Sequence, residues 1–285
     1  MKIDNDLTRM LGIEYPIIQG AYAWEGYGTS KIAVPVSEAG GLGIITAIAF
    51  KTAEDFREDI KKAMSLTDKP LAVNYSVLYG TEFTHEYYSE YVKAAFEEGI
   101  KIVFTSSYDG TPIGKEVKKE GCTWIHKCAT LKHAVSIAGK GVDALAIVGV
   151  EGAGNKTNEQ TTTLINITNA RKMITDIPLI AVGGIADAYG FAAALAMGAS
   201  GVYMGTAFMA TKEFQGPDDL LNPIINQSMT DPAYTTRALT TDPGVFHSQA
   251  AGVIDSVPDV KEFIESLVKG AKNRFEEIKG WGLTD

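Results

Sequence analysis

The chain has 285 residues and a net charge of −9, with 45% hydrophobic and 21% charged residues. This acidic balance excludes the basic surface of a typical nucleic-acid-binding protein, and the hydrophobic content excludes a mostly disordered chain. The length suits either two domains of roughly 150 residues each or one closed α/β barrel of about 250 residues.

Neither a disulfide framework nor a metal site is expected. The two cysteines, Cys122 and Cys128, are too few for a disulfide framework, and their spacing fits no common zinc-binding pattern. The four histidines are scattered at positions 85, 126, 133 and 247.

The sequence predicts no membrane partner. The segment Met1–Asp6 has no apolar signal region, so we expect a cytoplasmic protein. Residues 188–210 carry no charge and are long enough to cross a bilayer, but four glycines interrupt them. This pattern indicates a buried helix followed by a buried strand.

Eight short apolar runs predict the buried strands of a parallel sheet. Each run has four to six residues and lacks the polar alternation of a strand with one solvent-facing side. The runs cover residues 15–20, 42–46, 71–74, 102–105, 123–126, 144–148, 179–182 and 201–204.

Helical spacing of apolar residues occurs between most of these runs. The predicted helices are one that begins at a capping box at 52–55, and then 86–98, 131–140, 161–175, 187–197 and 206–212. Glycines at 40, 99, 121, 141 and 198 stand between a helix and the next strand, where a left-handed residue ends a helix.

Eight strands alternating with helices predict a (β/α)8 TIM barrel formed as a single domain by residues 1–285. A doubly wound open sheet is the alternative, but the first strand-to-helix turn lacks a G-x-G-x-x-G motif. The pattern lapses at 213–252, which predicts a lid over the barrel mouth with helix at 218–227. Residues 256–279 predict a C-terminal helix.

The functional site of such a barrel lies in the loops that follow the strands. Gly183-Gly184 and Gly205-Thr206 follow the last two predicted strands, where this fold often binds a phosphate through backbone N–H groups. Helix closure alone explains either glycine pair, but two pairs at matching positions favour phosphate binding.

Three polar residues stand near other strand ends. Asn74 can hold the edge of a heterocycle or simply fix a loop, and Lys127 can compensate negative charge on a ligand ring or lie on the surface. His126 is expected to point to the other face of its strand and to pack there. Cys122 and Cys128 are expected to be core thiols.

Taken in order, these motifs resemble the nitronate monooxygenase family, formerly 2-nitropropane dioxygenases. That family also includes NADH:quinone reductases and FMN-dependent enoyl-acyl-carrier-protein reductases. The resemblance covers about residues 7–212 and is carried by 15–20 (YPIIQG), 39–44 (AGGLGI), 73–74 (VN), 125–128 (IHKC), 141–144 (GVDA), 151–154 (EGAG), 181–187 (AVGGIAD) and 204–206 (MGT). The IHKC stretch resembles the quinone-reductase branch in particular.

The resemblance implies FMN in the barrel mouth, with NAD(P)H as a candidate co-substrate. It places the phosphate at Gly183, Gly184, Gly205 and Thr206, and the isoalloxazine beside Gly20, Ala21, Tyr22 and Ala23. It brings Asn74 and Lys127 to the ring, and Glu151, Ala153 and Gly154 to its edge.

Two residues depart from the family pattern. Tyr22 stands where methionine is common, and Asn155 stands where a histidine usually follows the residue matching Gly154. An amide has no pKa near neutrality, so Asn155 is predicted to position substrate by hydrogen bonding and not to transfer protons. Tyr22 is the next candidate for contacting the substrate.

The predicted function is an FMN-dependent oxidoreductase that oxidises alkyl nitronates with O2. The alternative within this class is NAD(P)H-dependent reduction of a quinone, enone or enoyl thioester. The alternative outside it is a non-catalytic phosphate-binding barrel. The expected partners are a small-molecule substrate and a second copy of the chain in a homo-oligomer, without nucleic acid.

Overall fold

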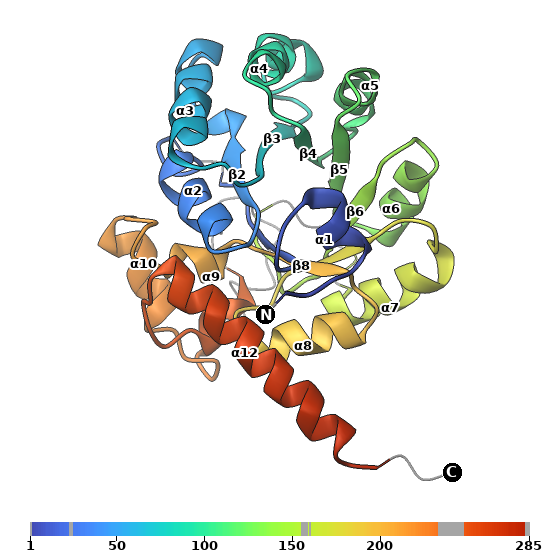
Figure 1. The fold of residues 1–285 in the computed structure, drawn as a ribbon, viewed down its shortest axis with the longest axis vertical. Coiled ribbons are helices and arrows are strands. Elements are labelled where there is room, and N and C mark those ends of the chain that lie inside the picture. Colours follow the sequence, from blue (N-terminus) through green and yellow to red (C-terminus); the bar gives the residue numbers. More distant parts are fainter. Residues whose placement is uncertain (1, 23–24, 155–158, 160, 233–247, 283–285) are drawn as a thin grey trace.

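Eight parallel strands close into a barrel surrounded by helices (Figure 1). The computed structural model describes residues 2–22, 25–154, 159, 161–232 and 248–282. The strand order is β1-β8-β7-β6-β5-β4-β3-β2, and a parallel bridge between Ile18 and Leu42 joins β1 to β2. The predicted (β/α)8 TIM barrel is therefore confirmed.

All eight strands lie at the predicted apolar runs, and all except β1 and β2, which begin two residues and one residue later, start at the predicted residue. They are β1 (Ile17–Gln19), β2 (Gly43–Thr46), β3 (Leu71–Val77), β4 (Ile102–Ser107), β5 (Thr123–Cys128), β6 (Ala144–Val148), β7 (Leu179–Val182) and β8 (Gly201–Met204). Strands β3, β4 and β5 continue past their predicted ends, because the ladder includes polar residues that the apolar pattern left out.

Helices follow the strands on the outside of the barrel. They are α2 (Ser30–Glu38), α3 (Ala53–Leu66), α4 (His85–Glu97), α5 (Thr111–Lys119), α6 (Leu131–Ala138), α7 (Thr163–Met173), α8 (Ala188–Ala196) and α9 (Thr206–Met209), with a short η1 (Ala47–Ala49) after β2. The sequence pattern did not delimit α2 and α5, nor helix α1 (Asp6–Leu11) before the barrel.

The glycines predicted to end helices all adopt left-handed backbone angles. Their φ values are 87° at Gly40, 88° at Gly99, 68° at Gly121, 88° at Gly141 and 96° at Gly198. Because a β-carbon is disfavoured in this region, glycine allows each helix to stop and the chain to enter the next strand at once.

Side chains that point into the barrel form one hydrophobic cluster, which includes Ile18, Ile44, Phe104 and Ile180. Leu7 of α1 belongs to the same cluster and is fully buried. Helix α1 therefore fills the end of the barrel opposite the strands' carboxyl ends.

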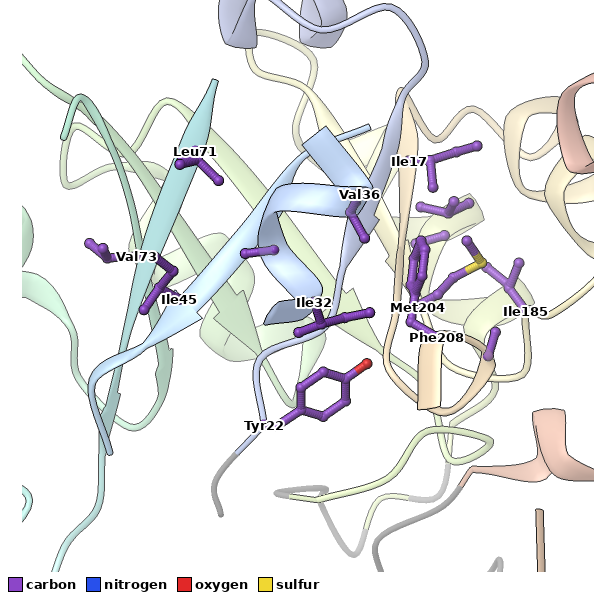
Figure 2. Packing of buried hydrophobic residues seen from close by; sticks show 14 of the residues in the cluster. Ile17, Tyr22, Ile32, Val36, Ile45, Leu71, Val73, Ile185, Met204 and Phe208 are labelled. Atoms are coloured by element: carbon purple, nitrogen blue, oxygen red, sulfur yellow. The ribbon is translucent and has the colours of Figure 1, made fainter. Parts of the chain in front are cut away.

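Side chains that point outward pack under the helices. Figure 2 shows part of this cluster, with Ile32 and Val36 of α2 near Met204 of β8 and Phe208 of α9. The alternation of inward and outward residues is the two-residue period of a strand.

The chain after β8 folds back on the barrel. It contains α10 (Asp218–Ile225), η2 (Gln249–Val253) and α12 (Val260–Lys279). The predicted lid at 213–252 lies partly outside the described residues, which omit 233–247. The C-terminal helix begins at 260 and not at 256, because Asp259 caps it by accepting a hydrogen bond from the Glu262 N–H at 2.8 Å.

The uncharged segment 188–210 forms α8 and β8, as predicted. Among the described residues, no helix combines the length and the apolar character needed to cross a membrane.

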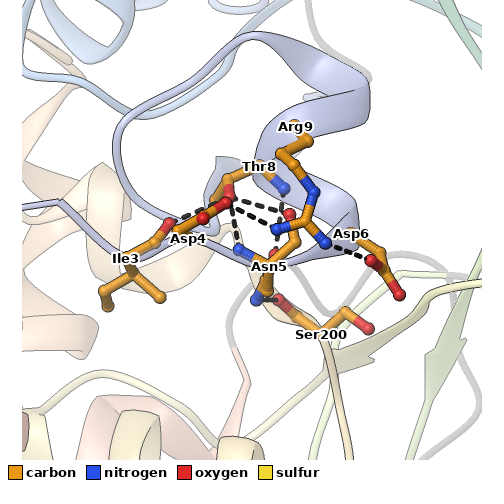
Figure 3. Close-up of polar contacts among 7 residues, drawn as sticks. All are labelled: Ile3, Asp4, Asn5, Asp6, Thr8, Arg9 and Ser200. Atoms are coloured by element: carbon orange, nitrogen blue, oxygen red, sulfur yellow. Dashed lines mark hydrogen bonds and ion pairs between the residues drawn. The ribbon is translucent and has the colours of Figure 1, made fainter.

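A cap and a long-range hydrogen bond fix α1 (Figure 3). Asn5 Oδ1 accepts from the Thr8 N–H at 3.0 Å, and Asn5 Nδ2 donates to the Ser200 carbonyl at 2.7 Å. Asn5 thus both starts the helix and holds it to the segment that leads into β8.

We predict that Asn5→Ala lowers the free energy of unfolding by about 1–3 kcal/mol, because it removes the cap and the bond to Ser200 together. Urea unfolding followed by circular dichroism measures the loss. Asp4→Ala is the control, because it removes only an exposed ion pair with Arg9 and should leave the unfolding midpoint unchanged. Equal effects of both substitutions would contradict the assigned role of Asn5.

Candidate functional site

A cavity of about 220 Å³ opens at the carboxyl ends of the strands. Its wall comes from the ends of seven strands, from α9 and from the segment after residue 247. The lining residues are Gly20, Ala21, Tyr22, Ser76, Leu78, Ser106, Ser107, Lys127, Gly152, Ala153, Gly154, Val182, Gly183, Gly184, Ile185, Tyr203, Met204, Gly205, Thr206, Met209 and Ser248.

Most of the residues predicted to bind the cofactor lie in this wall. They are Gly20, Ala21, Tyr22, Lys127, Ala153, Gly154, Gly183, Gly184, Gly205 and Thr206. Asn74 and Glu151 lie next to the wall but do not line the cavity. Ala23 and Asn155 lie outside the described residues, so their predicted roles stay predictions.

The ends of β7 and β8 present backbone N–H groups that have no acceptor in the described part of the chain. Gly183 and Gly184 have φ values of 103° and 74°, both left-handed, so glycine is required at each. Among the described residues, none accepts a hydrogen bond from the backbone N–H of Gly183, Gly184, Gly205 or Thr206. Unpaired N–H groups at this end of a barrel suit an anion.

Gly205 leaves open space in front of it. A β-carbon built there has as its nearest neighbour Tyr22 Cε1 at 3.9 Å. Thr206 Oγ1 accepts a hydrogen bond from the Ser248 N–H at 2.8 Å, which fixes the hydroxyl at the cavity wall. The segment after residue 247 therefore completes this part of the site; the sequence analysis placed 213–252 over the barrel mouth but did not single out Ser248.

Tyr22 is buried, and its ring packs edge-on against Phe214 with the centroids 5.0 Å apart. Its hydroxyl donates to the Gly205 carbonyl at 3.0 Å, and Figure 2 shows the ring directed toward the Met204 and Phe208 side of the site. Burial raises the pKa of Tyr22 well above its usual value of 10. The phenol stays neutral and holds the two loops together.

Tyr203 is a cavity residue that sequence reasoning missed. It points inward from β8, and its hydroxyl accepts from the Ala21 N–H at 2.5 Å. Its position in an apolar strand gave no signal beyond its inward register.

A chain of polar side chains leads from β3 to β4. Asn74 Nδ2 donates to Ser76 Oγ at 3.1 Å, and Ser76 Oγ lies 3.1 Å from Ser106 Oγ. Asn74 Oδ1 is buried and has no hydrogen-bond partner among the described residues. The sequence prediction ended β3 at Asn74 and β4 at Thr105, and so missed Ser76 and Ser106.

Lys127 lies beside Ser106 in the β4–β5 register and lines the cavity. No described residue forms an ion pair or hydrogen bond with its ammonium. Burial lowers the pKa of Lys127 to about 8. A charged group that loses hydration without gaining a partner favours an anionic ligand, because the ligand would restore the lost stabilisation.

Glu151 joins three segments next to the cavity. Its carboxylate accepts hydrogen bonds from the Thr163 N–H at 2.8 Å and from Thr163 Oγ1 at 3.1 Å, and its carbonyl accepts from the Gln249 N–H at 2.9 Å. These contacts tie the loop after β6 to the first residue of α7. The carboxylate therefore positions the loop that carries Ala153 and Gly154.

Residues 4–243 match the family model for nitronate monooxygenase. The chain belongs to the nitronate monooxygenase family. The resemblance inferred from the motifs is thereby confirmed.

Individual relatives agree with this assignment. A probable nitronate monooxygenase of Staphylococcus haemolyticus is 30% identical over 305 residues, covering 94% of this chain and 81% of the relative. A Mycobacterium tuberculosis (3aS,4S,5R,7aS)-5-hydroxy-7a-methyl-1-oxo-octahydro-1H-indene-4-carboxyl-CoA dehydrogenase is 29% identical, covering 99% and 77%. Both names denote oxidoreductases.

Solved structures share the fold. FabK from Thermotoga maritima superimposes with a TM-score of 0.85 at 28% identity, covering 98% of this chain and 100% of that one. Nitroalkane oxidase from Streptomyces ansochromogenes gives a TM-score of 0.80 at 20% identity, covering 96% and 100%. The latter supports the fold alone.

We predict that Tyr22→Phe lowers the free energy of unfolding by about 0.5–1.5 kcal/mol, because it removes the hydrogen bond to Gly205 and keeps the ring packing. Because the phenol is neutral on both sides of pH 8, the loss should be the same at pH 6.5 and pH 8.5. Urea unfolding at the two pH values measures it. Tyr27→Phe is the control, since Tyr27 stacks on the same Phe214 ring at 5.3 Å. A pH-dependent loss would show that Tyr22 ionises.

Proposed function

We propose that the cavity binds FMN and that the protein is an FMN-dependent oxidoreductase which oxidises alkyl nitronates with O2. The observation that carries this proposal is that one cavity contains two kinds of positively polarised groups that have no partner among the described residues. They are the backbone N–H groups at the β7–β8 end and the ammonium of Lys127 on β5. FMN offers a phosphate to the first and a polar ring edge to the second.

The β7–β8 end fits the phosphate. The backbone N–H groups of Gly183, Gly184, Gly205 and Thr206 would donate to its oxygens, with the Thr206 hydroxyl beside them. No lysine or arginine is needed there, since several oriented N–H dipoles stabilise an anion.

The opposite side fits the ring. When bound, FMN supplies the two-electron chemistry of its isoalloxazine. Lys127 would stabilise negative charge on the pyrimidine portion, and Asn74 Oδ1, which has no partner among the described residues, would offer an acceptor for a ring N–H. Ser76 accepts the hydrogen bond of Asn74, and Ser106, which is hydrogen-bonded to Ser76, extends the polar wall toward Lys127.

The side chains that line the cavity also indicate which reactions the site can support. Its described residues include no carboxylate and no imidazole. A nitronate arrives already deprotonated, so its oxidation needs no base from the protein. Hydride delivery from NAD(P)H needs no protein base either. The second candidate function is therefore NAD(P)H-dependent reduction of a quinone, enone or enoyl thioester, which the dehydrogenase named among the relatives favours.

We predict that Gly205→Asp reduces FMN affinity by about three decades, because two like charges about 4 Å apart repel by about 4 kcal/mol at an effective dielectric constant of 20. Gly205→Ala is the matched control. Its added β-carbon meets nothing closer than 3.9 Å, so the variant should fold and retain FMN.

Fluorescence titration of the flavin-free protein measures both affinities, and mass spectrometry identifies the cofactor released from the purified protein. Unchanged FMN affinity in Gly205→Asp would place the phosphate elsewhere. FAD as the released cofactor, or no flavin binding at all, would refute the proposed cofactor.

Anaerobic mixing distinguishes the two reactions. We predict that propyl nitronate bleaches the flavin absorbance, while NADH and NADPH do so at most slowly. Rapid bleaching by either nicotinamide and none by the nitronate would reject nitronate oxidation and support the reductase. Catalytic amounts of protein with O2 then show whether the nitronate turns over.

A further inference from the structure

A second group of chemically reactive side chains lies outside the barrel, behind β5. His126 and Cys128 alternate with Lys127, so they point away from the cavity toward the helices. His133 comes from the first turn of α6, and its N–H donates to Thr130 Oγ1 at 2.9 Å. One potential ligand atom from each of these three residues lies within 4.8 Å of the other two.

His126 is fully buried, and only one of its two ring nitrogens has a hydrogen-bond partner among the described residues. Its Nδ1 lies 2.7 Å from Thr105 Oγ1, and Trp124 Nε1 donates to the same hydroxyl oxygen at 2.7 Å. Its Nε2 is buried and has no partner among the described residues. A histidine that binds a metal characteristically uses one ring nitrogen and pairs the other with a neighbouring polar group. His126 has this arrangement, with Thr105 as the neighbour.

Packing alone explains a buried thiol but not this nitrogen. An apolar residue in place of His126 would fill the space without leaving a polar atom unpaired, which is costly in a protein interior. The ring of His133 lies against that of His126, with the centroids 4.9 Å apart, yet the two form no hydrogen bond. A cation between them would use both rings.

We propose that His126, Cys128 and His133 form a binding site for a Zn²⁺ ion. Two imidazoles and one thiolate are a ligand set that zinc favours, and an outer molecule such as water supplies the fourth position. On binding, the S–H bond of Cys128 breaks, a sulfur–zinc bond forms, and the proton passes to solvent.

The surroundings support this assignment. Burial lowers the pKa of His126 to about 3 and also lowers that of His133, so both rings are neutral and able to bind metal. The Asp109 carboxylate lies close enough to act electrostatically on both rings. His133 is half-buried, which gives an ion a route from solvent.

The geometry needs only a small adjustment. Bonds of about 2.0 Å to nitrogen and 2.3 Å to sulfur place tetrahedral ligand atoms roughly 3.5 Å apart. A separation at the 4.8 Å limit therefore has to shorten by about 1 Å when the ion binds. The site does not depend on the proposed FMN chemistry, because it lies on the other face of the strand.

The test uses the full chain, freed of metal by dialysis against a chelator. Zn²⁺ affinity is measured by competition with a chromophoric chelator, and Co²⁺ serves as the spectroscopic probe. We expect one ion per chain and a sulfur-to-cobalt charge-transfer band in the near ultraviolet. Cys128→Ala and His133→Ala should each weaken Zn²⁺ binding by at least about 100-fold, and Cys128→Ala should abolish the band.

Two matched variants serve as controls. Cys122→Ala removes the other buried thiol, and His85→Ala removes another half-buried histidine, which pairs with Glu116 at 2.8 Å. Both should keep wild-type Zn²⁺ affinity. Circular dichroism verifies folding, and if Cys128→Ala does not fold, His133→Ala decides the question.

The proposal is overturned if the wild-type chain binds no stoichiometric Zn²⁺. It is equally overturned if His133→Ala binds Zn²⁺ as tightly as His85→Ala does. FMN titration of the same variants separates this result from the proposed function, because loss of FMN binding with intact Zn²⁺ binding would affect only the latter.

Discussion

Closure of the sheet is the constraint on which the rest of the structure depends. β1 pairs with β8 along its length and touches β2 through the bridge from Ile18 to Leu42. In a closed parallel barrel every strand residue faces either the interior or the helices, and a shift by one residue would reverse the two faces. On β5 this rule sends Lys127 inward and both His126 and Cys128 outward. Both the cavity and the cluster behind it follow from that alternation.

Much of this architecture was predictable because the strands are buried on both sides. A strand covered by other strands and helices has to be apolar over its whole length, so short apolar runs located all eight. The phosphate-binding prediction rested on Gly183-Gly184 and Gly205-Thr206 together, and the left-handed angles of Gly183 and Gly184 explain why glycine stands at the first pair. The outward direction predicted for His126 also followed directly from the strand period.

The sequence did not predict features that depend on contacts between distant segments and not on the local pattern of apolar residues. Ser76 and Ser106 extend β3 and β4 beyond the apolar runs, because parallel pairing continues for as long as backbone partners exist. Helix α2 contains Pro35 in its interior, which weakens any helical signal, and burial against the barrel stabilises it instead. The approach of His133 to His126 depends on how α6 packs, which no spacing along the chain reveals.

Unpaired buried polar atoms connect the two proposals. Among the described residues they are few, and they include Asn74 Oδ1 and His126 Nε2. Each such atom costs stability unless a partner satisfies it, so selection removes it or supplies a ligand. Asn74 of β3 lies next to the proposed ring site and is level with Ile125 of β5, and His126 and Lys127 are the next two residues of that strand. A ligand on either face therefore acts on the same short strand. An ion held by His126 and Cys128 would restrain the backbone on both sides of Lys127, and so would stabilise the direction in which its ammonium points into the cavity.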